Sequence, residues 1–342
     1  MDLYLFRKDD FSRLYNCSYF TQDEWRRQGE PSTLLGVVSI VVGMFFTMVY
    51  IPCLIVMIKS KLLKINAYKI MFYLGLYDMS SVCINSIASG IYTIRGDVGC
   101  NGLELKYIIG MMGIYSWMVQ SCAVVLLALN RLIEISKLRC FGKIFDGRMI
   151  YFWLLATQIY GTVWWLYSPA PLFTSKSSAW FFDPYHGIQD LDYIDRSPYK
   201  NVPYVVHNCT IAGLLPLIYT VVIVALWLKV RKGGAKTSKL QYVITVQSFI
   251  ICLTVMVGSV VYAIMNVVEV SELYGLVAST AWLINSGIPS IIYLTMNKTI
   301  RSGTLELLRC GRIEKYRGGT SVSPGSGAHL ATVSARQCVH ES

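Results

Sequence analysis

The chain has 342 residues, of which 54% are hydrophobic and only 15% are charged. This composition excludes an ordinary water-soluble domain. The formal net charge of +11 would suggest a nucleic-acid partner in a soluble protein. In a chain this apolar, the charge reflects orientation in a membrane and attraction to an anionic inner leaflet, so we expect membrane lipid and no nucleic acid as partners.

Seven apolar runs follow one another along the chain. Each run is longer than the roughly 20 residues that a helix needs to cross about 30 Å of hydrocarbon. They cover residues 34–58, 70–94, 107–129, 149–173, 204–228, 242–268 and 273–296. The runs therefore predict an all-α membrane protein with a bundle of seven transmembrane helices.

The basic residues between these runs fall mostly in alternate connections. The segments that follow the first, third, fifth and seventh runs hold 21 of the 31 Lys and Arg residues. The other four segments hold 14 of the 20 Asp and Glu residues. Because cytoplasmic loops retain the Lys and Arg excess, we expect the N-terminus outside and the C-terminus in the cytoplasm.

This pattern divides the chain into four parts. We expect an extracellular N-terminal segment at 1–33, the seven-helix domain at 34–296 and a juxtamembrane segment with a candidate short amphipathic helix at 297–317. Residues 318–342 are rich in Ser, Gly and Ala and are expected to be disordered. The long acidic connection 174–203 is expected to be a flexible outer loop, able to fold over the bundle mouth.

Polar residues recur at three- and four-residue steps in three of the runs, which places them on one face of each helix. Polar groups inside a membrane usually face the bundle interior or a hydrated cavity. The three stripes are Asp78, Ser81, Asn85, Ser89 and Tyr92 in the second run; Trp117, Gln120, Ser121, Val124, Ala128 and Arg131 in the third; and Trp282, Asn285, Ser286, Pro289 and Tyr293 in the seventh. They predict a partly hydrated interior.

Two of these residues lie at similar depths. The helical rise places Asp78 about 12 Å and Asn285 about 16 Å from the inner ends of their helices. The two side chains are therefore expected to meet through a water or an ion, and the alternative is a hydrogen-bonded helix pair with no signalling role. For Arg131, periodicity alone favours an interfacial arginine that anchors its helix.

Cysteine and histidine spacing indicates neither a metal site nor an enzyme. Ten cysteines show no metal-binding pattern, and only Cys17, Cys100 and Cys209 can reach the outer side, so we expect at most one disulfide there. Asn16 begins an Asn-Cys-Ser glycosylation sequon on the same side. The chain has no phosphate-binding glycine loop and no zinc-spaced His pair, so no enzymatic activity, cofactor or metal is expected.

The chain resembles the nematode serpentine chemoreceptors of class T, which are seven-helix receptors. The resemblance runs from about Tyr15 to Arg301, and its specificity comes from the order and spacing of short motifs. These are Tyr15-Asn16-Cys17-Ser18 with Trp25, Tyr50 to Leu54, Tyr68 to Asp78, Cys100, Trp117 to Gln120, Leu129-Asn130-Arg131, and Pro289 to Tyr293 followed by Asn297 and Arg301.

The resemblance implies rhodopsin-like topology and assigns roles on the inner side of the bundle. Arg131 occupies the place of the arginine that ends the third helix in rhodopsin-like receptors and contacts the G protein. Asn130 stands where such receptors have Asp or Glu, so a restraining ion pair is either absent or supplied by another group. Lys229, Arg231 and Lys232 complete the expected coupling surface.

The resemblance also suggests an activation switch and a disulfide. Pro289 to Tyr293 is similar to the Pro-x-x-Tyr motif of rhodopsin-like receptors with one extra residue, which turns Tyr293 by about 100° around the helix. Asp78, Asn285, Pro289 and Tyr293 form the candidate switch. Cys17 and Cys100 both match the family pattern and are the preferred disulfide, with Cys209 as a competing partner.

The function that the resemblance implies is that of a chemosensory G-protein-coupled receptor, multi-pass in the plasma membrane of a sensory-neuron cilium. It would bind a small external ligand and activate a heterotrimeric G protein. Candidate pocket residues are Asn85, Ser89, Trp117, Gln120, Asn266 and Trp282. The alternative is a seven-span transporter or ligand-gated channel, whose polar path would also explain the stripes, although no internal repeat typical of transporters is found.

Overall fold

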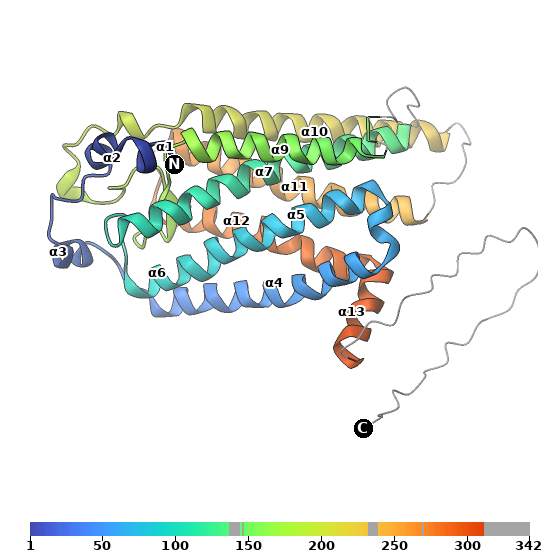
Figure 1. Ribbon diagram of the computed structural model, residues 1–342, viewed down its shortest axis with the longest axis horizontal. Helices are drawn as coiled ribbons and strands as arrows, with labels where there is room; N and C mark the ends of the chain where they lie inside the picture. Colours follow the sequence, from blue (N-terminus) through green and yellow to red (C-terminus); the bar gives the residue numbers. More distant parts are fainter. Residues whose placement is uncertain (137–143, 146, 232–238, 269, 311–342) are drawn as a thin grey trace, which may run out of the picture.

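A bundle of long helices dominates the computed structural model, which describes residues 1–136, 144–145, 147–231, 239–268 and 270–310 (Figure 1). The helices run side by side along the longest axis of the molecule. They are α4 (Thr33–Lys59), α5 (Asn66–Val82), the π-helix η2 (Cys83–Ala88), α6 (Ser89–Arg95), α7 (Leu103–Ser136), α9 (Met149–Tyr167), α10 (Val202–Arg231), α11 (Lys239–Val267) and α12 (Glu272–Met296).

Six spans in the described residues are long and apolar enough to cross a membrane, with α5, η2 and α6 forming one continuous span. The seventh bundle helix is α9, which is shorter and carries six Tyr and Trp residues whose polar atoms lower its hydropathy. Its place in the bundle is clear, because α9 packs along α7. The expected seven-helix membrane bundle is confirmed.

The fourth span is shorter than its apolar run suggests. Helix α9 ends at Tyr167, and Ser168 is extended with ψ of 148°. The residue before a proline disfavours helical geometry, and Pro169 and Pro171 follow. The expectation that this span continues to Phe173, with Pro169 inside it, is therefore wrong: Phe173 belongs to a β-strand.

The first and second spans approach each other closely through glycine. A Cβ atom on Gly36 would lie 2.5 Å from the carbonyl oxygen of Gly90, and one on Gly43 would lie 2.1 Å from the hydroxyl of Ser86. Ser86 lies in η2, and its hydroxyl donates to the carbonyl of Ser39. Small residues at helix contacts are a common packing device in membranes.

The polar stripes face the interior, as their helical spacing predicts. All sixteen stripe residues are buried. Helix α7 holds the central position, since it packs against α5, α9, α10 and α11. The interior is therefore built around one helix that extends from one end of the bundle to the other.

The N-terminal end of the bundle is covered by short elements (Figure 1). Three helices come from the N-terminal segment, and the long connection between α9 and α10 adds a β-hairpin and two 3-10 turns. These elements are α1 (Asp2–Phe6), α2 (Lys8–Leu14), α3 (Gln22–Arg27), β1 (Leu172–Thr174), β2 (Ala179–Phe181), η3 (Gln189–Leu191) and η4 (Ser197–Tyr199).

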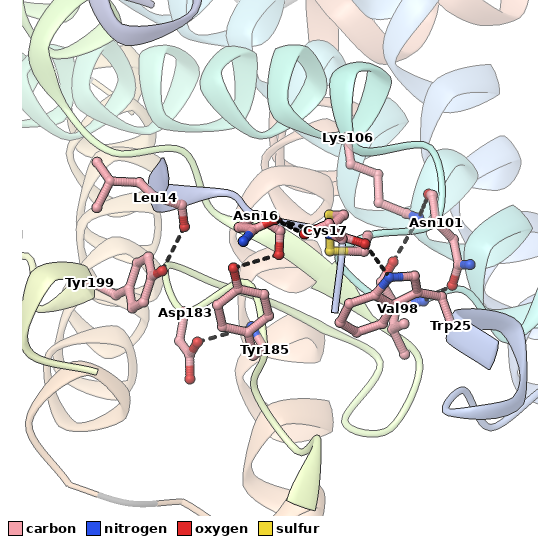
Figure 2. Close-up of a disulfide and its surroundings, with 12 residues drawn as sticks. Leu14, Asn16, Cys17, Trp25, Val98, Asn101, Lys106, Asp183, Tyr185 and Tyr199 are labelled. Atoms are coloured by element: carbon pink, nitrogen blue, oxygen red, sulfur yellow. Dashed lines mark hydrogen bonds between the residues drawn. A yellow bond between two sulfur atoms is a disulfide. The ribbon is translucent and has the colours of Figure 1, made fainter. Parts of the chain in front are cut away.

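A disulfide between Cys17 and Cys100 joins the N-terminal segment to the loop before α7 (Figure 2). The indole of Trp25, which is fully buried, donates to the Cys17 carbonyl at 2.9 Å. Two tyrosines of the α9–α10 connection bind the same segment: Tyr185 donates to the Asn16 carbonyl at 2.8 Å and Tyr199 to the Leu14 carbonyl at 2.6 Å. The connection is therefore packed against the N-terminal segment.

At the opposite end, α13 (Lys298–Cys310) turns away from the bundle axis (Figure 1), and the short 3-10 turn η1 (Lys61–Lys64) joins the first two spans. The Asn297 side chain starts α13 by accepting hydrogen bonds from the backbone of Thr299 and Ile300. Gly303 packs against Val56 of α4. The candidate amphipathic helix of the juxtamembrane segment lies here, whereas residues 311–342, including the expected disordered tail, lie outside the described residues.

We expect Cys17→Ser to lower the stability of the protein by about 2–4 kcal/mol, because a disulfide that closes a long loop restricts the unfolded chain. Thermal unfolding of the purified protein and a non-reducing gel measure the effect. Cys209→Ser is the matched control, since Cys209 is an exposed free thiol. An unchanged gel shift and unfolding temperature in Cys17→Ser would contradict this disulfide.

Candidate functional site

A cavity lies inside the bundle beneath the β1–β2 hairpin. Its wall combines residues of η2, α7, α10, α11 and α12 with residues of the hairpin. The lining residues are Ile84, Gly110, Gly113, Ile114, Trp117, Pro171, Trp180, Phe181, Phe182, Tyr204, Tyr262, Met265, Asn266 and Trp282. The cavity has a volume of about 40 Å³, which is room for about three waters. The cavity therefore suits a small molecule.

The β1–β2 hairpin forms the roof of this cavity. Its antiparallel pairing sets Leu172 opposite Phe181 and Phe173 opposite Trp180. The indole of Trp180 donates to the hydroxyl of Ser89 at 2.8 Å, which fixes the hairpin to α6. On the other side, Ser279 of α12 donates to the Ser178 carbonyl at 2.8 Å. The roof is thus held from two helices.

Two glycines of α7 let other lining residues approach this helix closely. A Cβ atom on Gly110 would lie 2.0 Å from the carbonyl oxygen of Pro171, and one on Gly113 would lie 3.2 Å from the Trp282 ring. Tyr262 stands between two tryptophans, with ring centroids 6.2 Å from Trp117 and 6.3 Å from Trp282. This part of the cavity wall is consequently aromatic.

Three of the six candidate pocket residues line this cavity: Trp117, Asn266 and Trp282. The other three are occupied nearby. Asn85 donates to the Ser279 carbonyl at 2.6 Å, Ser89 accepts from Trp180, and Gln120 donates to Asp78 at 2.6 Å. Helical spacing placed them on the inner faces of their helices but could not tell a cavity wall from a hydrogen-bonded contact.

Asp78 is the centre of a buried polar cluster deeper in the bundle. Its carboxyl group accepts hydrogen bonds from the Tyr50 hydroxyl of α4 and from the Gln120 amide of α7. Ser81 extends the cluster by donating to the Gln120 carbonyl oxygen at 3.3 Å. The cluster therefore joins the first three spans by neutral donors around one carboxyl group.

The other switch candidates lie on α12 but do not bond to Asp78 in the described structure. Asn285 is 3% exposed, and its side-chain oxygen has no hydrogen-bond partner among the described residues. Tyr293 packs its ring 6.2 Å from that of Tyr50 and donates to the Met71 carbonyl at 3.4 Å. Pro289 is buried inside α12. Tyr50, rather than Asn285, connects Asp78 with this helix.

Arg131 lies near the other end of α7 and is buried, with 1% of its surface exposed. Its guanidinium donates to the Asn130 side chain at 2.5 Å and to Gln241 of α11 at 3.0 Å. It is therefore not an interfacial arginine that reaches toward water. Both side chains that accept hydrogen bonds from Arg131 are neutral amides, so neither forms the ion pair that would restrain an arginine at this place.

The remaining coupling candidates are only partly described. Arg231 is exposed and stacks over the ring of its neighbour Trp227, with 5.2 Å between the guanidinium carbon and the ring centroid. Lys229 lies on the last turn of α10. Lys232 and the rest of 232–238 lie outside the described residues.

Sequence reasoning missed most of the cavity wall. Trp180, Phe181 and Phe182 come from a connection that has no helical period to orient them. Tyr262 could have been predicted from helical spacing, because it lies one helical turn before Asn266 on the same face of α11. Tyr50 is a single tyrosine in an apolar run, and nothing local marks it as the partner of Asp78.

A membrane bundle of seven helices, with a roofed cavity at one end and a buried arginine at the other, defines a seven-helix receptor. The family model for "Serpentine type 7TM GPCR chemoreceptor Srt" matches residues 2–317. The chain belongs to this family. It is also 28% identical over 307 residues to "Serpentine receptor class T-55" of Caenorhabditis elegans, a match that covers 88% of this chain and 82% of that protein.

The roof of the cavity is expected to loosen in acid. The His186 ring stacks on Phe181 with 3.6 Å between centroids, and burial, with a smaller effect of Arg196, lowers the pKa of His186 to about 4 from its ordinary 6.5. An unpacked His186 binds a proton between these two pH values and a packed one does not. Stability should therefore fall as the pH drops from 6.5 toward 4.

Thermal unfolding of purified wild-type and His186→Phe receptor at several pH values tests this effect. The variant keeps an aromatic ring on Phe181 but cannot bind a proton. Its unfolding temperature should therefore depend less on pH in this window than that of the wild type. The same slope in both proteins would show that His186 does not control the roof.

Proposed function

We propose that the chain is a chemosensory receptor that binds a small external ligand in the roofed cavity and activates a heterotrimeric G protein at the opposite end. The observation that carries this function is the position of Trp117 and Arg131 on one continuous helix, α7. Fourteen residues separate them, or roughly 21 Å of helix. A movement of α7 relative to its neighbours therefore acts on both ends at once.

The N-terminal end faces outward in this proposal, and the end with Arg131 faces the cytoplasm. The excess of Lys and Arg in alternate connections supports this orientation. The Cys17–Cys100 disulfide supports it as well, since disulfides persist in oxidising compartments. The Asn16 sequon lies beside that disulfide and is accordingly a glycosylation site. The membrane is the plasma membrane of a sensory cilium.

Release of Arg131 is the output step. In the structure Arg131 is held by Asn130 and by Gln241, so its guanidinium is not free to contact a partner. Separation of α11 from α7 breaks the contact with Gln241 and exposes Arg131. A ligand drives this change only if it binds the separated arrangement more tightly. Arg231, Lys229 and Lys232 are the further residues that we propose contact the G protein.

Helix α13 lies on the inner leaflet in this orientation. Leu305 and Leu308 are exposed apolar side chains on a helix that also carries Arg301 and Arg309. A helix with apolar and basic side chains binds at the surface of an anionic membrane. The side chain of Cys310, a candidate for acylation, lies outside the described residues.

A transporter or channel is the competing function, and one measurement separates it from the receptor. Receptor reconstituted in lipid with purified Gα should accelerate nucleotide exchange when ligand is added. A current evoked by ligand in the absence of any G protein would favour the channel. The interior favours the receptor, because Asp78, Gln120 and Ser81 bond to one another.

We expect Arg131→Gln to remove ligand-dependent nucleotide exchange while leaving ligand affinity within about twofold. The variant lacks the cation but keeps a hydrogen-bonding side chain near Gln241. Exchange on purified Gα and equilibrium ligand binding measure the two effects separately. Retained G-protein activation would refute the proposed role of Arg131.

Gln241→Ala is expected to raise nucleotide exchange in the absence of ligand by roughly tenfold. The variant removes the hydrogen bond from the charged Arg131, which exists only while α11 lies against α7. Lys239→Ala is the matched control on the same helix, two residues before Gln241. Equal basal activity in both variants and the wild type would show that Gln241 does not restrain α11.

A further inference from the structure

The wall of the cavity carries no charge. Every lining residue in the described structure is apolar, aromatic or a neutral amide. The cavity lies between the bundle helices and the β1–β2 hairpin and offers no charged side chain, so an anion that entered it would lose water without gaining an opposite charge. Burial of an unpaired ion is far more costly than burial of a neutral molecule. The wall therefore selects against carboxylates and phosphates.

Two hydrogen-bond donors of the wall are unused. The indole N–H of Trp282 and the hydroxyl of Tyr262 are buried and have no hydrogen-bond partner among the described residues. Each residue is only 7% exposed, so bulk water does not satisfy these groups. A buried donor without a partner is unfavourable, and an acceptor placed against it removes that penalty.

A third wall residue shows the contrast. Trp117 also lines the cavity, but its indole N–H already donates to the Asn208 side chain at 3.0 Å. Similarly, the side-chain amide of Asn266 donates to the Tyr262 carbonyl at 2.8 Å. Among the described lining residues, the buried polar side-chain atoms without any partner are thus those on the neighbouring rings of Tyr262 and Trp282.

We propose that the ligand is a small uncharged molecule with a short apolar body and one hydrogen-bond acceptor, such as a ketone, aldehyde or ester, that accepts from Trp282, Tyr262 or both. This inference rests on the proposed function, since it names the ligand class of the same cavity. The aromatic wall contacts the body of the ligand, and the two donors orient its acceptor.

Matched probes test the assignment. Acetone carries the acceptor, 2-methylpropene has a CH₂ group in place of the carbonyl oxygen, and acetate and acetamidinium are charged molecules of similar shape. Butanone, 2-methyl-1-butene and propanoate form a second set. Binding is measured as the concentration-dependent rise in unfolding temperature of purified receptor in lipid, without G protein. Each ketone should bind about two- to tenfold more tightly than its alkene.

Variants test whether the donors of Trp282 and Tyr262 cause the preference for ketone over alkene. Trp282→Phe and Tyr262→Phe each keep a ring and remove one donor, so the ratio of ketone to alkene affinity should fall toward one. Trp117→Phe is the matched control, because its N–H is already bound to Asn208; it should leave the ratio unchanged. Comparing ratios between variants cancels the partitioning of the probes into lipid.

Three outcomes overturn the ligand class: equal binding of ketone and alkene by the wild type, binding of a charged probe as tight as that of its ketone, or binding of no neutral probe. Nucleotide exchange on Gα is measured separately. If the ketones bind but no ligand accelerates nucleotide exchange, the proposed function is refuted. The proposed ligand class still holds in that case. Exchange evoked only by charged ligands refutes the class and supports the function.

Discussion

The structure depends on one constraint: polar groups inside hydrocarbon must find their partners within the protein. The three polar stripes meet this requirement by facing inward, where Asp78 accepts from Tyr50 and Gln120 and Ser81 bonds to Gln120. These contacts hold the first three spans together. They also explain why α7 is central, since it supplies a polar partner to the spans on several sides.

The same helix connects two sites of different character. Near one end of α7, Gly110, Gly113 and Trp117 form part of an uncharged cavity wall. Near the other end, Arg131 is buried against Asn130 and Gln241. Breaking the hydrogen bond between Arg131 and the neutral Gln241 costs less free energy than breaking a buried ion pair. In the proposed function, a modest difference in ligand affinity between the two helix arrangements is therefore enough to release Arg131.

Much of the bundle could be predicted from the sequence, because membrane thickness sets the length of a span and helical period sets its inward face. The stripes of the second, third and seventh spans and the family membership follow from such local patterns. The end of α9 was misplaced because apolar Pro-Ala-Pro residues extend the run without extending the helix. Contacts between residues far apart in the sequence, such as Arg131 with Gln241 and Trp180 with Ser89, are not marked by any local sequence pattern. The cavity wall was consequently predicted only where it lies on a stripe.

The origin of the cavity roof bears on how receptors of this kind diverge. Trp180, Phe181 and Phe182 come from a connection between helices, whereas the contacts of Asp78 and Arg131 lie within the helices themselves. Loops tolerate substitution better than the elements they join. A duplicated gene can therefore change the lining of the cavity by changing a few roof residues, while the helix framework and the end that carries Arg131 stay the same.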